Sequence, residues 1–141
     1  MDLGAGTFEE IWFRGILLYA LVRILKNHKY GILLALIIIA VVFGSVHLLN
    51  SGVSTKELML NALSAGAGGL LLGSVYLKSK NLVLPMFLYF IQDFSLAFFK
   101  PTFINQTTFT VTILQVVLYL IAALILIRNI EPQKWLDSEV I

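Results

Sequence analysis

The sequence of 141 residues contains no cysteine, and only 13% of its residues are charged. Without cysteine the chain has no disulfide framework, no thiolate nucleophile and no Cys-based metal site. Its 59% share of hydrophobic residues excludes a water-soluble monomer, because soluble domains are about 45–50% apolar. The ten Lys and Arg residues lie mostly between apolar runs, so nucleic-acid binding has no support. Phosphate-binding loops, dinucleotide motifs and Ser-His-Asp signatures are also absent from the sequence.

The N-terminus lacks the pattern of a cleavable signal peptide. Such a peptide has a basic start, a short apolar stretch and a small-residue cleavage site, whereas this chain begins Met-Asp-Leu-Gly-Ala-Gly. The first apolar segment also carries Glu9, Glu10 and Arg14, which an export signal would tolerate poorly. We interpret this segment as a working part of the protein.

What the sequence has in abundance is long apolar runs. They cover five segments, at 7–24, 30–49, 57–77, 82–99 and 109–127. A membrane-spanning helix needs about 20 apolar residues, and the backbone must satisfy its own hydrogen bonds in lipid. The alternating pattern of a membrane β-barrel is absent. The sequence therefore predicts an all-α, polytopic transmembrane helical bundle of about five spans, in a single domain covering residues 1–141.

The basic residues between the spans predict the orientation, because Lys and Arg are retained on the cytoplasmic side. Seven of them fall in the first loop, the third loop and the C-terminal tail: Arg23, Lys26, Lys29, Lys78, Lys80, Arg128 and Lys134. Only Lys56 and Lys100 fall on the other side. We expect an integral membrane protein with the N-terminus outside and the C-terminus in the cytoplasm.

Four charged residues stand out inside the predicted spans, where a charge costs at least about 2.5–3.5 kcal/mol to insert and usually marks function. They are Glu9, Glu10, Arg14 and Asp93. Glu10 and Arg14 are four residues apart and can form an ion pair on one helix face, which could be a simple intrahelical neutralisation. Glu9 points about 100° away from Glu10 on a helix, which leaves its carboxylate free to act as a base or as a metal ligand.

Two further sites hold polar residues in apolar surroundings. His47 ends an apolar helix just after Gly44 and Ser45, which allow a neighbouring helix to come close; the alternative is an interfacial histidine. Tyr89 and Asp93 share a helix face, where the alternative is an aromatic stripe with one hydrogen-bonded acid. The predicted topology brings these sites to the same depth, in the outer half of the membrane.

Small residues follow one face of the third predicted helix. They are Ala62, Gly66, Gly69 and Gly73. Such a stripe is typical of close helix packing rather than of a ligand site. We expect it to hold the third helix tightly against its neighbours.

The polar motifs resemble those of a known family. Residues 9–15, Glu-Glu-Ile-Trp-Phe-Arg-Gly, are similar to the EExxxRG motif of the CPBP intramembrane proteases, which include the CAAX prenyl endopeptidases and the bacterial Abi proteins. Residues 43–47 resemble the FxxxH motif, and residues 68–93 resemble the glycine-rich helix, turn and third motif helix. The resemblance implies a glutamate-dependent intramembrane endopeptidase of the bacterial cell membrane that cleaves a peptide or a membrane-protein substrate, linked to bacteriocin self-immunity or to peptide maturation.

The same resemblance implies roles for individual residues. Glu9 would be the general base, with Glu10 paired to Arg14 or exchanging roles with Glu9. His47 would bind the water, a metal or the oxyanion, and Asp93 takes the position of the family's final Asn or Asp. Together Glu9, His47 and Asp93 would suit zinc or another divalent metal by ligand type.

The chain departs from the family pattern in two ways. Tyr89 stands where the third motif normally has histidine; a phenol can donate to an oxyanion but is a poor proton shuttle or metal ligand. Additional helices normally precede the first motif, which here begins at Glu9; the alternatives are a minimal member, a fragment of a longer chain, or a wall supplied by a second copy or a partner subunit. The alternative function is a catalytically impaired relative that acts as a binding, immunity or regulatory partner in the membrane.

Overall fold

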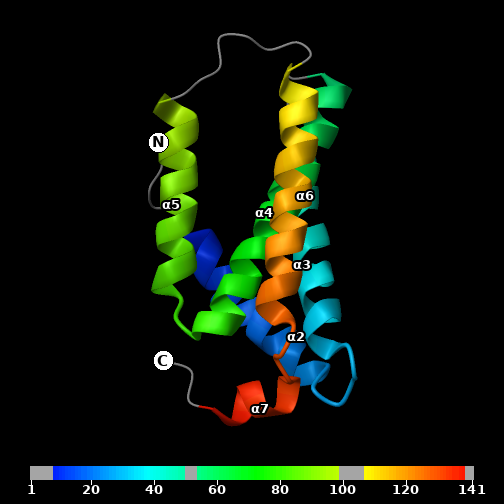
Figure 1. Ribbon diagram of the computed structural model, residues 1–141, viewed down its shortest axis with the longest axis vertical. Coiled ribbons are helices and arrows are strands. Elements are labelled where there is room, and N and C mark those ends of the chain that lie inside the picture. The colour runs from blue at the N-terminus through cyan, green and yellow to red at the C-terminus, as the bar shows by residue number, and fades with distance from the viewer. Residues whose placement is uncertain (1–7, 50–53, 99–106, 139–141) are drawn as a thin grey trace.

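The computed structural model describes residues 8–49, 54–98 and 107–138, without the side chains of 93–98 and 107–108. Within these ranges every regular element is helical and none is a strand, which confirms the predicted all-α membrane bundle (Figure 1). The elements are η1 (Ile11–Leu18), α2 (Tyr19–Ile24), α3 (Gly31–Val46), η2 (His47–Leu49), α4 (Thr55–Ser79), α5 (Val83–Phe98), α6 (Thr107–Ile127) and α7 (Pro132–Asp137).

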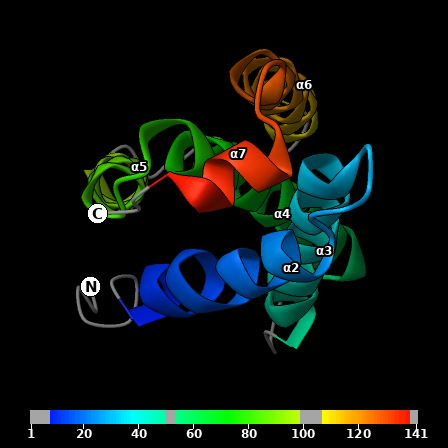
Figure 2. The same cartoon turned by 90° about the horizontal axis from the view of Figure 1, so that it is seen from below.

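Each of the five predicted segments forms a helix, but not all of them are alike. Three are long and apolar enough to cross a membrane: Gly31–Leu49, Thr55–Ser79 and Phe109–Ile127. Val83–Gln92 is a shorter apolar helix. The first segment runs obliquely from about mid-height to one end of the bundle (Figures 1 and 2). The start of its described part therefore lies about half-way along the bundle.

Helix α4 is the centre of the bundle and packs against α3, α5, α6 and η1. Its approach to α3 is close because both helices have glycine at the crossing. A methyl group at Gly44 would lie 2.7 Å from the carbonyl oxygen of Ala62, and one at Gly66 would lie 3.0 Å from that of Ala40. A methyl group at Gly73 would lie 2.7 Å from Leu36. The close packing that the small-residue stripe predicts is therefore confirmed.

This packing makes a testable prediction about Gly44. Gly44→Ala should lower the stability of the detergent-solubilised protein by about 1–3 kcal/mol, because the new methyl group meets a backbone oxygen that cannot move alone. Gly68→Ala is the matched control, since its methyl group would find only ordinary contacts, at 3.8 Å or more. Thermal unfolding measures both variants. Equal midpoints for the two variants would contradict the close crossing of α3 and α4.

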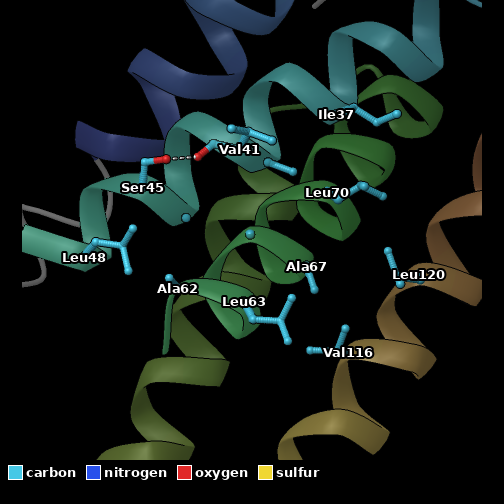
Figure 3. A pocket seen from close by; sticks show the side chains of 13 residues that line it. Ile37, Val41, Ser45, Leu48, Ala62, Leu63, Ala67, Leu70, Val116 and Leu120 are labelled. Carbon is cyan, nitrogen blue, oxygen red and sulfur yellow. Dashed lines mark hydrogen bonds between the residues drawn. The ribbon is translucent and has the colours of Figure 1, made fainter. Parts of the chain in front are cut away.

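An apolar groove of about 330 Å³ remains where α3 and α6 both pack against α4 without closing over it (Figure 3). Its floor is made of small residues of α3 and α4, including Gly44, Ala62 and Gly66, and Val116 and Leu120 of α6 form one wall. An apolar groove on a membrane protein is compatible with the surrounding acyl chains. The groove does not include any of the predicted catalytic residues.

The C-terminal end of α4 is covered by the short helix α7, which is not among the helices predicted from the sequence. The Trp135 indole Nε1 donates to the carbonyl oxygen of Leu77 at 2.7 Å, and the indole ring lies against Tyr19 and Tyr76. Helix α7 lies across this end of the bundle (Figures 1 and 2). The loops after α2 and α4 and the turn after α6 reach the same end (Figure 1), so the predicted basic loops do lie together.

Candidate functional site

The first polar motif lies on an unusual helix. Residues 11–18 form a π-helix between residues 8–10 and α2. A π-helix bonds each residue to the fifth along and is rare outside single turns, which are frequently found at functional sites. Arg14 and Leu18 are the buried residues of this element. The wide turn therefore places the Arg14 side chain inside the bundle.

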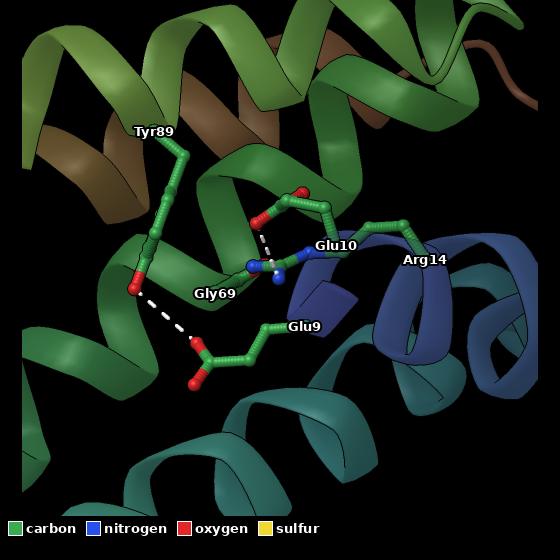
Figure 4. A network of polar contacts seen from close by, with 5 residues as sticks. All are labelled: Glu9, Glu10, Arg14, Gly69 and Tyr89. Atoms are coloured by element: carbon green, nitrogen blue, oxygen red, sulfur yellow. Dashed lines mark hydrogen bonds and ion pairs between the residues drawn. The ribbon is translucent and has the colours of Figure 1, made fainter. Parts of the chain in front are cut away.

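Glu10 and Arg14 form a fully buried ion pair. Arg14 Nη1 lies 2.7 Å from Glu10 Oε1, and both side chains are 0% exposed, so the pair that their spacing predicts is present. Arg14 Nη2 also donates to the carbonyl oxygen of Gly69 at 3.5 Å (Figure 4). The Phe43 ring centroid lies 5.0 Å from the guanidinium carbon, a cation–π distance. Arg14 thereby connects the first helix to both α3 and α4.

Glu9 occupies a different environment from its neighbour Glu10. Its side chain is only partly buried, and its Oε2 accepts a hydrogen bond from the Tyr89 hydroxyl at 3.3 Å (Figure 4). That distance is long for a bond from a hydroxyl to a carboxylate. The ion pairs of the described residues do not include Glu9. Of the two adjacent carboxylates, one is neutralised by a cation and the other is held by a phenol.

His47 lies at the end of α3 with one ring nitrogen engaged. Its Nδ1 is 3.0 Å from the carbonyl oxygen of Phe43. Because a carbonyl only accepts, Nδ1 must carry the proton, which leaves Nε2 of a neutral ring as an acceptor. The His47 ring also lies 5.1 Å from the Phe43 ring. Phe43 thus contacts both His47 and Arg14, a connection that the motif spacing does not reveal.

A methyl group at Gly69 would lie 3.3 Å from the Phe43 ring. The absence of a side chain at Gly69 therefore leaves room for both the ring and the guanidinium.

Within the described part of the chain, Glu10 Oε2 and Arg14 Nε are buried without a hydrogen-bond partner. Buried polar atoms of this kind ordinarily bind ordered water. The polar cluster is therefore suited to hold water inside the apolar bundle.

The structure describes the side chains of only two of the three predicted metal ligands, Glu9 and His47. The side chain of Asp93 lies outside the described residues. Among the residues whose side chains are described, no three His, Asp or Glu groups are placed to share a metal ion.

One comparison with known proteins gives a match. A family model described as type II CAAX prenyl endopeptidase Rce1-like matches residues 2–95. This stretch contains Glu9, Glu10, Arg14, His47, Tyr89 and Asp93. No curated protein and no solved structure matches the chain.

Proposed function

Because the chain belongs to the type II CAAX prenyl endopeptidase Rce1-like family, we propose that it is an intramembrane endopeptidase in which Glu9 activates the attacking water. The observation that supports this assignment is the different environment of the two carboxylates. Glu10 is fully buried against Arg14, whereas Glu9 is only partly buried and, among the described residues, accepts a hydrogen bond from the neutral Tyr89 hydroxyl. Glu9 is therefore the carboxylate that is available to accept a proton.

The proposed reaction uses groups of this chain alone. Glu9 removes a proton from water as the water oxygen attacks the scissile carbonyl carbon, and His47 Nε2 accepts the second hydrogen bond of that water. A protonated carboxyl is a poorer acceptor, so the Tyr89 hydroxyl then turns from Glu9 to donate to the tetrahedral oxyanion. Glu9 returns its proton to the leaving amine as the C–N bond breaks, which regenerates the carboxylate.

Arg14 acts in this scheme as a positioning residue. Its bonds to Glu10 and the Gly69 carbonyl fix the first helix against α4, and the helix in turn presents Glu9. We assign Asp93, by its place in the third motif, to orient the substrate from α5. Metal assistance from zinc or another divalent ion through Glu9, His47 and Asp93 would require the Asp93 carboxylate to reach the other two.

The substrate class follows from the position of the site within the apolar bundle. A peptide or a membrane-protein segment would reach Glu9 through the lipid, and we propose that it enters from the side opposite the basic loops. We propose that the basic loops face the cytoplasm, which places the N-terminus outside and the C-terminus in the cytoplasm. Bacteriocin self-immunity and peptide maturation are two processes in which cleavage of such a substrate would serve the cell. A second copy or a partner subunit could complete the wall beside the first helix.

The second candidate is a non-catalytic relative that binds a membrane partner. The observation that favours it is Tyr89, which replaces an expected histidine and holds Glu9 in a hydrogen bond. In this case the polar cluster only holds the helices together. Substitutions in it would then reduce the amount of folded protein without affecting any turnover.

Substitutions at Tyr89 separate the two candidates. In an active enzyme, Tyr89→Phe should lower the cleavage rate by about 10²–10³, as removal of one oxyanion donor does, and the protein should stay folded because only the hydroxyl is lost. Cleavage of quenched fluorescent transmembrane peptides in liposomes measures the rate. If the unmodified protein does not cleave and Tyr89→His gains cleavage, the chain is a degraded enzyme. If neither protein cleaves, the binding role is supported.

A further inference from the structure

A second pocket, of about 230 Å³, opens at the basic end of the bundle. It lies between the last turn of α4, the turn after α6, and α7. Its polar lining includes Lys78, Lys80, Asn129 and Lys134, and its apolar lining includes Leu77 and Trp135. The mechanism proposed above uses none of these residues.

The pocket carries a net positive charge. Among the described residues that line it are three lysines and one acid, Glu131. Lys134 Nζ pairs with Glu131 Oε1 at 3.0 Å, and Lys80 Nζ donates to the Ser138 hydroxyl. An ammonium group has three donors, so Lys80 and Lys134 both keep donors for a further acceptor. The pocket can therefore bind an anion that has several acceptor oxygens.

The place of the pocket in the fold indicates the source of that anion. It lies where the apolar helices α4 and α6 end, at the end that also holds the last turn of α2 with Arg23 and the following loop with Lys26 and Lys29 (Figure 1). Helix α7 lies across this end (Figure 2), and its Trp135 side chain is buried there. Basic pockets between membrane helices on the cytoplasmic side bind anionic headgroups.

We propose that this pocket binds the phosphate of an anionic phospholipid. The phosphate oxygens accept hydrogen bonds from Lys78, Lys80 and Lys134, and the glycerol and first methylenes of the lipid contact the apolar side of the pocket. Bound lipid would thereby link the C-terminal end of α4 to α7. This site is separate from the polar cluster around Glu9, so it does not depend on the protein being a protease.

Lipid titration of the purified full-length chain in neutral detergent, followed by native mass spectrometry, tests the proposal. Phosphatidylglycerol should bind more tightly than phosphatidylcholine. The double variant Lys78→Gln with Lys134→Gln should bind phosphatidylglycerol about 25-fold more weakly, at about fivefold for each lysine. Glu131→Gln should bind it more tightly, because a negative charge in the lining of the pocket is removed.

The matched control is the double variant Lys26→Gln with Lys29→Gln, which removes the same charge at the same end but outside the pocket lining. It should leave phosphatidylglycerol binding nearly unchanged. An equal loss in both double variants would overturn the proposal, because the overall charge of this end would then be sufficient. Displacement of phosphatidylglycerol by an equal concentration of soluble glycerophosphate would also overturn it, because the site would then be one for a free anion.

Discussion

Glu9→Gln is expected to abolish cleavage while the amount of folded membrane protein stays at that of the unmodified protein. Glutamine keeps the size of the side chain and can still accept the Tyr89 hydroxyl bond, but it cannot take a proton from water. Loss of a general base lowers a rate by about 10²–10⁴. Hydrolysis of quenched fluorescent transmembrane peptides in liposomes measures the effect, and near-equal yields after size-exclusion chromatography establish the folded state.

The control for this substitution is Asp137→Asn, which removes one negative charge from an exposed side chain of α7. We expect it to cleave at the rate of the unmodified protein. Full activity in Glu9→Gln would remove the basis of the proposed reaction. Loss of activity together with loss of folded protein would instead assign Glu9 a structural function.

Glu10→Gln is expected to lower the free energy of unfolding. Arg14 would keep its charge in a position that is 0% exposed, and removal of one partner of a buried ion pair costs about 3–5 kcal/mol. The double variant Glu10→Gln with Arg14→Met should recover most of this loss, because no buried charge is left unpaired. Unfolding in mixed micelles of increasing SDS content measures the unmodified protein, the single variants Glu10→Gln and Arg14→Met, and the double variant, and these four values complete the cycle.

The exposed pair Glu131–Lys134 supplies the comparison for that cycle. Its side chains are 64% and 77% exposed, and exposed ion pairs contribute about 0–1 kcal/mol, so Lys134→Gln should change the unfolding midpoint little. A stable but inactive Glu10→Gln would show that Glu10, and not Glu9, is the base. Glu9→Gln thus tests the assignment of the general base, and Glu10→Gln tests the assignment of the buried structural carboxylate.

Much of the fold is predictable from the length of the apolar runs, because a helix in lipid satisfies its own backbone. The runs at 30–49, 57–77 and 109–127 predict the three long helices closely. The oblique course of the first helix is not predictable in this way, since hydropathy gives the length of a segment but not its tilt. Helix α7 was missed because it has only six residues and depends on a tertiary contact, that of Trp135 with Leu77.

The contacts of the site were predictable where the residues are close in sequence, and its residues were predictable where they match a known motif. The four-residue spacing of Glu10 and Arg14 is enough to predict their pair. The bond between Tyr89 and Glu9 joins residues 80 apart in sequence, and it depends on how α5 and the first helix pack around α4. No spacing rule contains that information. The assignment of Asp93 and a metal stays a prediction, since the Asp93 side chain lies outside the described residues.

The π-helix at 11–18 makes the presentation of the two carboxylates depend on chain length as well as on residue type. Its turns contain more residues than those of an α-helix. A one-residue deletion at an exposed position such as Ile16 or Leu17 would keep every motif residue, yet it would rotate Glu9 and Glu10 about the helix axis relative to α2. A relative could therefore retain the complete motif and still lose the geometry that separates a paired carboxylate from an available one.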